Sequence, residues 1–235
     1  MVVDMTGTPS GRADWLQADA EDQPTDLLAS RLRAGHPDLP MRWGASIELG
    51  NATVNLASAR DGTVVGLRLL RRDERELVAR FFAGLSAESR RRRFLQPMPR
   101  LPEAMLRRLV AVDGRRHVAV VAEADGQCVG IARWIALTDD PGTAEVAVTV
   151  TDRFQGRGIG RLLVQALRPA AVRAGLTSLV FLVDPTNRPA LRLLRSLGVE
   201  LAFRDGLVKG RQRLPPGGSD PTMVREVTWE TDTSA

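Results

Sequence analysis

Residues 145–163 read EVAVTVTDRFQGRGIGRLL, and the hydrophobic pattern changes at a glycine-rich turn in their middle. Up to residue 151, apolar and more polar residues alternate with the period of two that a half-buried strand requires. From Gly156 onward, apolar residues return every three or four positions, which is the spacing of a helix that buries one face. The segment therefore predicts a strand, a tight turn and a long helix over 156–174 in immediate succession.

The turn between strand and helix predicts an anion site. A helix N-terminus carries N–H groups without intrahelical partners and the positive end of the helix dipole, so phosphates bind there readily. The glycines allow the main chain to approach a ligand closely, and Arg153, Arg157 and Arg161 add positive charge. The dinucleotide fingerprint G-x-G-x-x-G is absent, because Arg161 and Leu163 occupy the positions of its third glycine.

The pattern on both sides of this segment indicates an α/β (α+β) protein. Strands are expected at 63–70, 117–123, 128–137, 144–151, 177–183, 199–203 and 207–212, and helices at 73–85, 86–95, 102–112, 156–174 and 188–197. Strands that gather first and then alternate with helices are typical of a mixed sheet flanked by helices.

The two ends of the chain differ from its middle in composition. Residues 1–62 are rich in polar and small residues and contain only short apolar runs, at 27–32 and 47–56, so we expect a polar, flexible N-terminal extension. Residues 63–213 form the expected domain. The C-terminal tail, 214–235, begins with prolines and glycines, and its alternation at 223–229 suits an edge strand.

Composition excludes several classes of chemistry. No stretch reaches the roughly 18 apolar residues of a spanning helix, and no apolar signal core is present in residues 1–20, so a cytoplasmic location without membrane contact is expected. Cys128, His36 and His117 are the only residues of their types and cannot build a zinc site, so no metal is expected. The single lysine, Lys209, precedes glycine, which excludes a G-K-[ST] phosphate loop.

The charge balance points to an anionic ligand rather than to nucleic acid. The net charge is +5, but 28 acidic residues accompany the basic ones, and aromatic residues make up only 4% of the chain. Few aromatic side chains are therefore available to stack on bases. DNA binding is the weakest interpretation, and it predicts an affinity that falls steeply with salt.

Two motifs carry a resemblance to a known family. Gln155-x-x-Gly158-x-Gly160 resembles the acyl-CoA signature of the GNAT superfamily of N-acetyltransferases, and the stretch from Asn187 to Val199 is similar to the second CoA-side motif of that superfamily. The motifs stand in the family's order and together cover about 144–199. The resemblance implies the GNAT fold, a mixed, mostly antiparallel twisted sheet of about seven strands flanked by helices, with 63–213 as the acetyltransferase domain.

The resemblance also implies acetyl-CoA as co-substrate, with its pyrophosphate on the backbone amides of the turn. A main-chain N–H of the motif strand would stabilise the oxyanion, with Val148 as the candidate, and Val150 would hold the pantetheine arm by strand-like pairing. The implied cofactor-binding residues are Val148, Val150, Gln155, Gly156, Arg157, Gly158, Ile159, Gly160, Arg161 and Asn187.

Acetyl transfer to an amine requires a base, because a lysine amine with a pKa of about 10.4 arrives protonated. Residues 144–147 resemble the segment that holds the catalytic glutamate in protein-acetylating members, so Glu145 is the implied general base, directly or through water. This role calls for apolar neighbours, with Val146 and Trp134 as candidates. A solvent-facing glutamate in an ion pair is the alternative.

The leaving thiolate has no evident acid. Many family members use a tyrosine, but Leu194 stands at the matching position, and the chain contains no tyrosine. Water, Ser196 and the departing ammonium remain as candidates. The missing acid keeps a non-catalytic, CoA-binding regulatory module open as an alternative to an enzyme.

Residues 85–94, LSAESRRRRF, look like part of the acetyltransferase domain of actinobacterial protein lysine acetyltransferases, the Pat-like proteins. This resemblance favours a protein lysine as the acyl acceptor. For the assembly, a monomer and a homodimer both stay open. A small-molecule amine as acceptor stays open. The run 90–93 is either a solvated helix face or part of a surface that docks a protein substrate.

Overall fold

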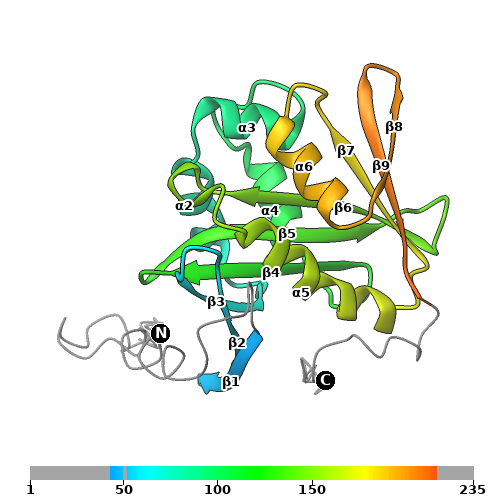
Figure 1. Cartoon of the computed structure of the whole chain (residues 1–235). Coiled ribbons are helices and arrows are strands. Elements are labelled where there is room, and N and C mark those ends of the chain that lie inside the picture. Colours follow the sequence, from blue (N-terminus) through cyan, green and yellow to red (C-terminus); the bar gives the residue numbers. More distant parts are fainter. Residues whose placement is uncertain (1–42, 50–51, 216–235) are drawn as a thin grey trace, which may run out of the picture. The chain divides into compact units, whose positions relative to one another are not determined.

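The computed structural model describes residues 43–49 and 52–215, with side chains from residue 54 onward. In this part of the chain, nine strands form one sheet in the order β1-β2-β3-β4-β5-β6-β7-β9-β8 (Figure 1). The strands are Trp43–Leu49 (β1), Ala52–Ser58 (β2), Val64–Leu69 (β3), His117–Ala124 (β4), Gln127–Ala136 (β5), Thr143–Val150 (β6), Ser178–Val183 (β7), Glu200–Arg204 (β8) and Leu207–Arg213 (β9).

Five α-helices flank this sheet in the described residues: Arg75–Ala83 (α2), Ala87–Phe94 (α3), Glu103–Val110 (α4), Ile159–Arg173 (α5) and Arg188–Ser196 (α6). A short 3-10 helix, Asp152–Phe154 (η2), connects β6 to the turn before α5. The predicted α+β class and the mixed, mostly antiparallel sheet are confirmed, because β6 and β7 form the only parallel pair among the strands described.

The sheet is covered on both faces, which explains why β4 is almost continuously apolar. Its residues Val118, Val120 and Ala122 belong to the core under α5, whereas Ala119 and Val121 belong to the core under α2 and α4. Figure 1 shows α5 crossing the sheet on one face. Helices α2, α4, α5 and α6 bury apolar residues at the spacing that the sequence predicted, whereas α3 buries only Ser89.

Turn residues fix the hairpins of the sheet. Asp125 and Gly126, between β4 and β5, have φ values of 50° and 68°, as a two-residue type I′ turn requires. Asp205 and Gly206, between β8 and β9, repeat this pattern with φ values of 54° and 76°. Both hairpins lie where the sequence predicted adjacent strands.

The sheet is larger than the sequence predicted. Strands β1 and β2 lie within the stretch 1–62 that was expected to be a flexible extension, and they raise the count from about seven strands to nine. The reason is tertiary: β2 pairs with β3 along 55–58 and buries Leu56 and Ala57 against it. Residues 1–42 and the predicted edge strand at 223–229 lie outside the described residues.

One irregularity of the sheet creates the site. β6 and β7 pair at only three registers, from Thr143 with Ser178 to Glu145 with Val180. Beyond this point β6 stays hydrogen-bonded to β5, and β7 stays hydrogen-bonded to β9. The two parallel strands therefore diverge within the sheet, and β7 leaves the direction of β6 in Figure 1.

Candidate active site

The divergence of β6 from β7 opens a cleft of about 700 Å³, which residues of β6, β7, α3, α6 and the turn before α5 line. Directly after β6, the Thr151 N–H donates to the Val129 carbonyl of β5 at 2.9 Å. The main-chain groups of the odd-numbered residues of β6 therefore face β5, with which the strand pairs. Because hydrogen-bonding direction alternates along a strand, the main-chain groups of Val148 and Val150 point to the opposite side, toward the cleft.

The glycine turn closes the wide end of this cleft. Gly156 and Gly158 have φ values of 78° and 92°, a region that residues with a Cβ rarely adopt. Within the described chain, the N–H groups of residues 156–160 have no hydrogen-bond acceptor. Since α5 begins at Ile159, these donors lie at the positive end of its dipole. The turn thus offers an anion several unpaired donors.

Gly160 is required for a different reason, which is close packing. A Cβ at this position would lie 3.2 Å from Cδ2 of Leu193 on α6 and 3.8 Å from Cγ1 of Val148 on β6. The glycine therefore lets α5 approach both walls of the cleft.

Gln155 holds the turn in place. Its side-chain Nε2 donates to the Val150 carbonyl at 3.0 Å and to Ser89 Oγ at 3.1 Å. The Gln155 side chain thus connects the end of β6, the turn and helix α3. Gln155 and the next residue, Gly156, both line the cleft.

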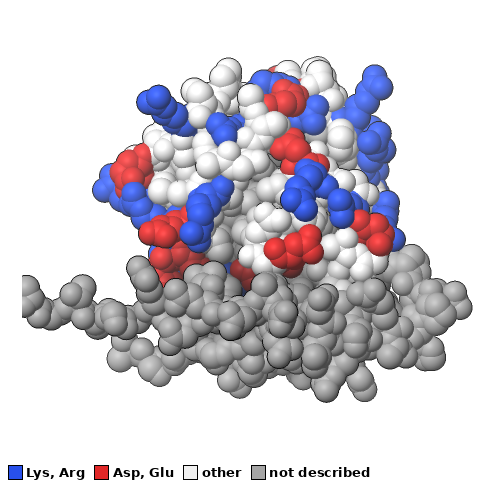
Figure 2. Space-filling view, turned by 90° about the vertical axis from the view of Figure 1, so that its left-hand side faces the viewer, with Lys and Arg blue, Asp and Glu red and all other residues white. Residues whose placement is uncertain are grey.

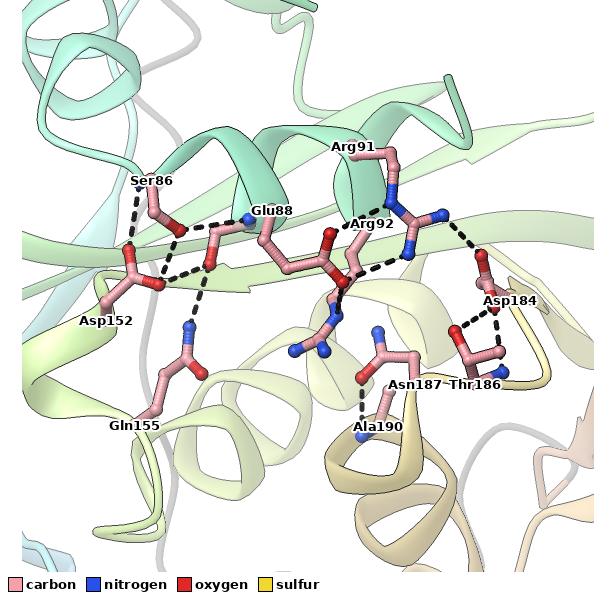
Figure 3. Close-up of polar contacts among 11 residues, drawn as sticks. Ser86, Glu88, Arg91, Arg92, Asp152, Gln155, Asp184, Thr186, Asn187 and Ala190 are labelled. Carbon is pink, nitrogen blue, oxygen red and sulfur yellow. Dashed lines mark hydrogen bonds and ion pairs between the residues drawn. The ribbon is translucent and has the colours of Figure 1, made fainter. Parts of the chain in front are cut away.

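Helix α3 is fixed at its first turn to the loop that follows β6 (Figure 3). Ser86 caps the helix by accepting from the Ser89 N–H at 3.1 Å, and the Ser86 and Ser89 hydroxyls donate to Asp152 Oδ1 at 2.7 and 2.8 Å. Burial by itself would raise the pKa of Asp152, but hydrogen bonds from the Ser86 N–H and both hydroxyls hold it below its ordinary value. Asp152 is therefore an ionised anchor.

The same helix is fixed to the loop that follows β7. Arg91 donates to Asp184 at 2.7 Å and also pairs with Glu88 at 2.9 Å (Figure 3). Hydrogen bonds from Thr186 and Arg91 lower the pKa of Asp184 to about 2. Helix α3 thus bridges the two loops at which the diverging strands end, and the width of the cleft depends on these contacts.

Asn187 lies at the start of α6, where its Oδ1 accepts from the Ala190 N–H at 3.2 Å (Figure 3). This bond makes Asn187 the N-cap of α6, and Asn187 lines the cleft, with no described residue as a partner for its Nδ2. The sequence predicted a cofactor contact here, and the cap explains why the residue type also suits the helix.

The predicted basic residues of the turn have different surroundings. Arg161 lines the cleft and donates to the Ser196 carbonyl at 2.9 Å, which connects α5 with α6. Arg157 instead forms an ion pair with Asp61 at 3.0 Å and stacks on Phe154. Five further arginines line the cleft, Arg60, Arg92, Arg93, Arg192 and Arg195. Arg92 and Arg93 belong to the run 90–93, for which the sequence left a solvated helix face and a docking surface open. Sequence reasoning did not single out the other three.

Glu145 stands at the last paired register of β6 and β7, where the cleft begins, and its side chain is exposed. It makes no ion pair with a described residue. The expectation that Val146 and Trp134 surround it is wrong. These two residues pair across β5 and β6 and are buried under α5, whereas the side chain of Glu145 points to the other face of the sheet.

The candidates for a general acid are limited. Leu194 is 3% exposed and belongs to the apolar core. Ser196 lines the cleft, but its hydroxyl already donates to the Leu193 carbonyl at 2.7 Å. Burial raises the pKa of the Cys128 thiol to about 12, which makes it a poor nucleophile.

Charge on the surface is mixed. Figure 2 shows acidic and basic side chains interspersed on the face it presents, instead of a single basic area. Within residues 43–49 and 52–215, no group of three or more His, Cys, Asp and Glu residues is arranged to hold a metal ion. The helices of this part are all too short or too polar to cross a membrane.

The glycine turn at a helix N-terminus, beside a diverging pair of parallel strands, agrees with the acyl-CoA-dependent transferase that the sequence motifs implied. Residues 82–199, half of the chain, match the acetyltransferase (GNAT) family, and the chain belongs to that family. It is a GNAT N-acetyltransferase, and the fold that the sequence motifs implied is confirmed.

Relatives in sequence and in structure agree with this assignment. An acetyltransferase of Pseudomonas aeruginosa is 34% identical over 145 residues, which are 60% of this chain and 77% of that protein. The acetyltransferase Pat of Mycolicibacterium smegmatis is 34% identical over 139 residues, 58% of this chain and 41% of that protein. The crystal structure of the GNAT domain of S. lividans PAT superposes with a TM-score of 0.64 at 26% identity, covering 75% of this chain and 100% of that domain.

Enzymes of this family use acetyl-CoA, and the residues of the cleft fit that molecule. The unpaired N–H groups of residues 156–160 suit a pyrophosphate, and the free edge of β6 suits an extended amide-containing arm. From Glu145 to Val150 the strand rises by roughly 17 Å, which leaves room for such an arm between the turn and the apex of the cleft.

Proposed function

We propose that this protein transfers the acetyl group of acetyl-CoA to a primary amine, the side chain of a protein lysine, by direct attack with Glu145 as general base. The observation that carries the proposal is the position of Glu145 at the apex of the cleft, where β6 and β7 separate. The glycine turn lies at the other end of the same free strand edge. The proposal thus assigns a base and a phosphate site to opposite ends of one strand.

The roles of the other residues follow from this arrangement. Acetyl-CoA supplies an activated thioester. The N–H groups of residues 156–160 bind its pyrophosphate, Val150 pairs with the pantetheine arm, and the Val148 N–H stabilises the negative charge that develops on the carbonyl oxygen. Gln155, Arg161 and Asn187 complete the cofactor contacts.

Glu145 takes the proton of the incoming ammonium, either directly or through water. The neutral amine then forms the new C–N bond as the C–S bond breaks, and the thiolate leaves with a proton from water, Ser196 or the nitrogen that has just reacted. Exposure of Glu145 supports exchange of its proton with solvent between turnovers.

The choice of a protein lysine is supported by the resemblance of residues 85–94 to protein lysine acetyltransferases. These residues include α3, which lines the cleft on the side of Glu145. The 34% identity with the acetyltransferase Pat supports the same choice. A small-molecule amine as acceptor and a non-catalytic CoA-binding module are the alternatives.

The test is the rate of CoA release from acetyl-CoA with lysine-containing proteins and peptides, together with calorimetric titration of acetyl-CoA. We expect Glu145→Gln to lower kcat about a hundredfold or more and to leave the affinity for acetyl-CoA within about twofold. Glu200→Gln is the matched control, because Glu200 is also an exposed strand glutamate but lies on β8, outside the cleft lining.

Three outcomes contradict parts of the proposal. A full rate in Glu145→Gln would exclude this residue as the base. Acetylation of free amines without acetylation of proteins would replace the protein lysine by a small acceptor. Binding of acetyl-CoA without turnover on any amine would leave the regulatory module as the function.

A further inference from the structure

Arg133, in the middle of β5, is a buried cation with no acidic partner among the described residues. It is 4% exposed, and it forms no ion pair with any described residue. Its hydrogen bonds come from Nη1 alone, which donates to the Leu109 carbonyl and to Nε2 of His117 at 3.2 Å. Burying a charge in this way is unfavourable unless an opposite charge compensates it.

His117 does not supply that charge. Its Nδ1 lies 3.0 Å from the Ala111 carbonyl, so Nδ1 carries the hydrogen and Nε2 accepts from Arg133. Burial, and then the positive charge of Arg133, lower the pKa of His117 to about 4. The ring is therefore neutral at pH 7, and the guanidinium of Arg133 remains uncompensated.

A second arginine stands beside the first. Burial and then the charge of Arg93, on the last turn of α3, lower the pKa of Arg133, which means that the two guanidinium groups repel each other. Arg93 stacks on the Phe94 ring at 4.9 Å and makes no hydrogen bond or ion pair with a described residue. Its neighbours differ in this respect, because Arg91 and Arg92 both pair with Glu88.

Both arginines line a small cavity of about 30 Å³, together with the Thr149 side chain and apolar residues of α2 and α4. Arg93 and Thr149 also line the main cleft, as Glu145 does, so the cavity adjoins the cleft. Glu145 interacts with Arg93 at a distance longer than an ion pair. The cavity thus combines a threonine with two guanidinium groups that form no ion pair with a described residue, and this is a donor set for a carboxylate.

We propose that Arg93 and Arg133 bind a carboxylate of the acyl acceptor, which a small acceptor carries itself and which, in a protein, belongs to an acidic side chain near the reacting lysine. The inference rests on the proposed transfer to an amine but not on a protein as the acceptor. A free anion from solution offers the same chemistry, and the experiment separates the two sources.

The experiment uses two pairs of acceptors, and the members of each pair differ only in having a carboxylate or a carboxamide. The pairs are Nα-acetyl-lysine with its carboxamide, and L-methionine with its carboxamide. For whichever of these two acceptors reacts, we expect the wild-type kcat/KM of the carboxylate form to be at least about tenfold higher than that of the carboxamide form. In Arg93→Gln, and in Arg133→Met, this ratio falls to about one, while the calorimetric affinity for acetyl-CoA stays within about twofold.

Arg107→Gln is the matched control, since Arg107 is an exposed helical arginine on α4 outside both cavities, and it keeps the wild-type ratio. Should Arg133→Met fail to fold, Arg93→Gln carries the test, because Arg93 is only partly buried. A ratio near one in the wild-type protein would overturn the proposal.

Two further measurements separate this proposal from the proposed function. Calorimetric titration of each carboxylate and its amide into the CoA-bound protein needs no turnover, so a preference for the carboxylate supports the site even if no product forms. Acetate at constant ionic strength is the probe for a free anion. One outcome would overturn the assignment to the acceptor: acetate raises the Tm of the wild-type protein but not of Arg133→Met, and the protein shows no preference between each carboxylate and its amide. The cavity would then bind a free anion.

Discussion

The two ends of the cleft are built in different ways. The end that we propose for the cofactor is built mainly by the stretch from Val148 to Gly160, and it presents mainly backbone groups. The end that we propose for the acceptor joins Arg93 from α3, Arg133 from β5 and Glu145 from β6, and it presents side chains. A site made of main chain leaves a local pattern of glycines, whereas a site made of side chains depends on the register between distant segments.

Replacement of Gly158 is expected to have the largest effect and to damage the cofactor end alone. Gly158→Val forces a branched side chain into a backbone with φ of 92° at the N-cap of α5, and we expect the affinity for acetyl-CoA to fall about a hundredfold. Isothermal titration calorimetry measures this loss.

Gly175→Val is the control for the strain itself. Gly175 has φ of 77° and open space around its Cα, but it follows the C-terminal end of α5. This variant should lose stability to a similar extent and keep its affinity for acetyl-CoA. An equal loss of affinity in both variants would mean that strain, and not the phosphate site, explains the effect.

Asp184 tests whether α3 couples the two ends. Asp184→Asn removes the charge that Arg91 contacts, and since this pair is partly exposed, we expect the free energy of unfolding at pH 7 to fall by about 1 kcal/mol. The KM for the acceptor should rise as well, because α3 carries Arg93. Urea unfolding and steady-state kinetics measure the two effects.

The pH dependence of this variant has a defined sign. The folded pKa of Asp184, about 2, lies below its ordinary value of 3.8, so its contribution to stability is complete above about pH 4 and is lost as the pH falls toward 2. The difference in free energy of unfolding between the wild-type protein and Asp184→Asn should therefore shrink as the pH falls from about 4 toward 2. Asp205→Asn, in an exposed pair with Lys209, should change stability by only a few tenths of a kcal/mol.

The smallest effects concern the basic residues of the cofactor end. Arg161→Gln should weaken acetyl-CoA binding about fivefold at low salt, because Arg161 lines the cleft. Arg157→Gln should weaken it about twofold, because Arg157 is occupied by Asp61 and Phe154. Calorimetry at two salt concentrations measures the loss of acetyl-CoA affinity in both variants. A larger loss in Arg157→Gln than in Arg161→Gln would contradict this prediction.

Much of the fold could be predicted because its elements carry local signals. The alternation in β6, the glycines before α5 and the Asp-Gly turn between β4 and β5 each depend on neighbouring residues. The pairing of β1 and β2 with the sheet could not be predicted in this way. β2 is stable as a strand because β3 provides its partner, and the sequence shows only a short apolar run at that place.

The sequence alone determined the family and the glycine turn before α5, since main-chain donors at a helix N-terminus require glycines at fixed spacing, and this spacing can be read directly. Only the tertiary structure decided the rest. Register between β5 and β6 turned Trp134 away from Glu145, and the path of α3 brought Arg93 beside Arg133. Contacts between distant side chains depend on how strands pair and helices pack, and no single segment encodes that.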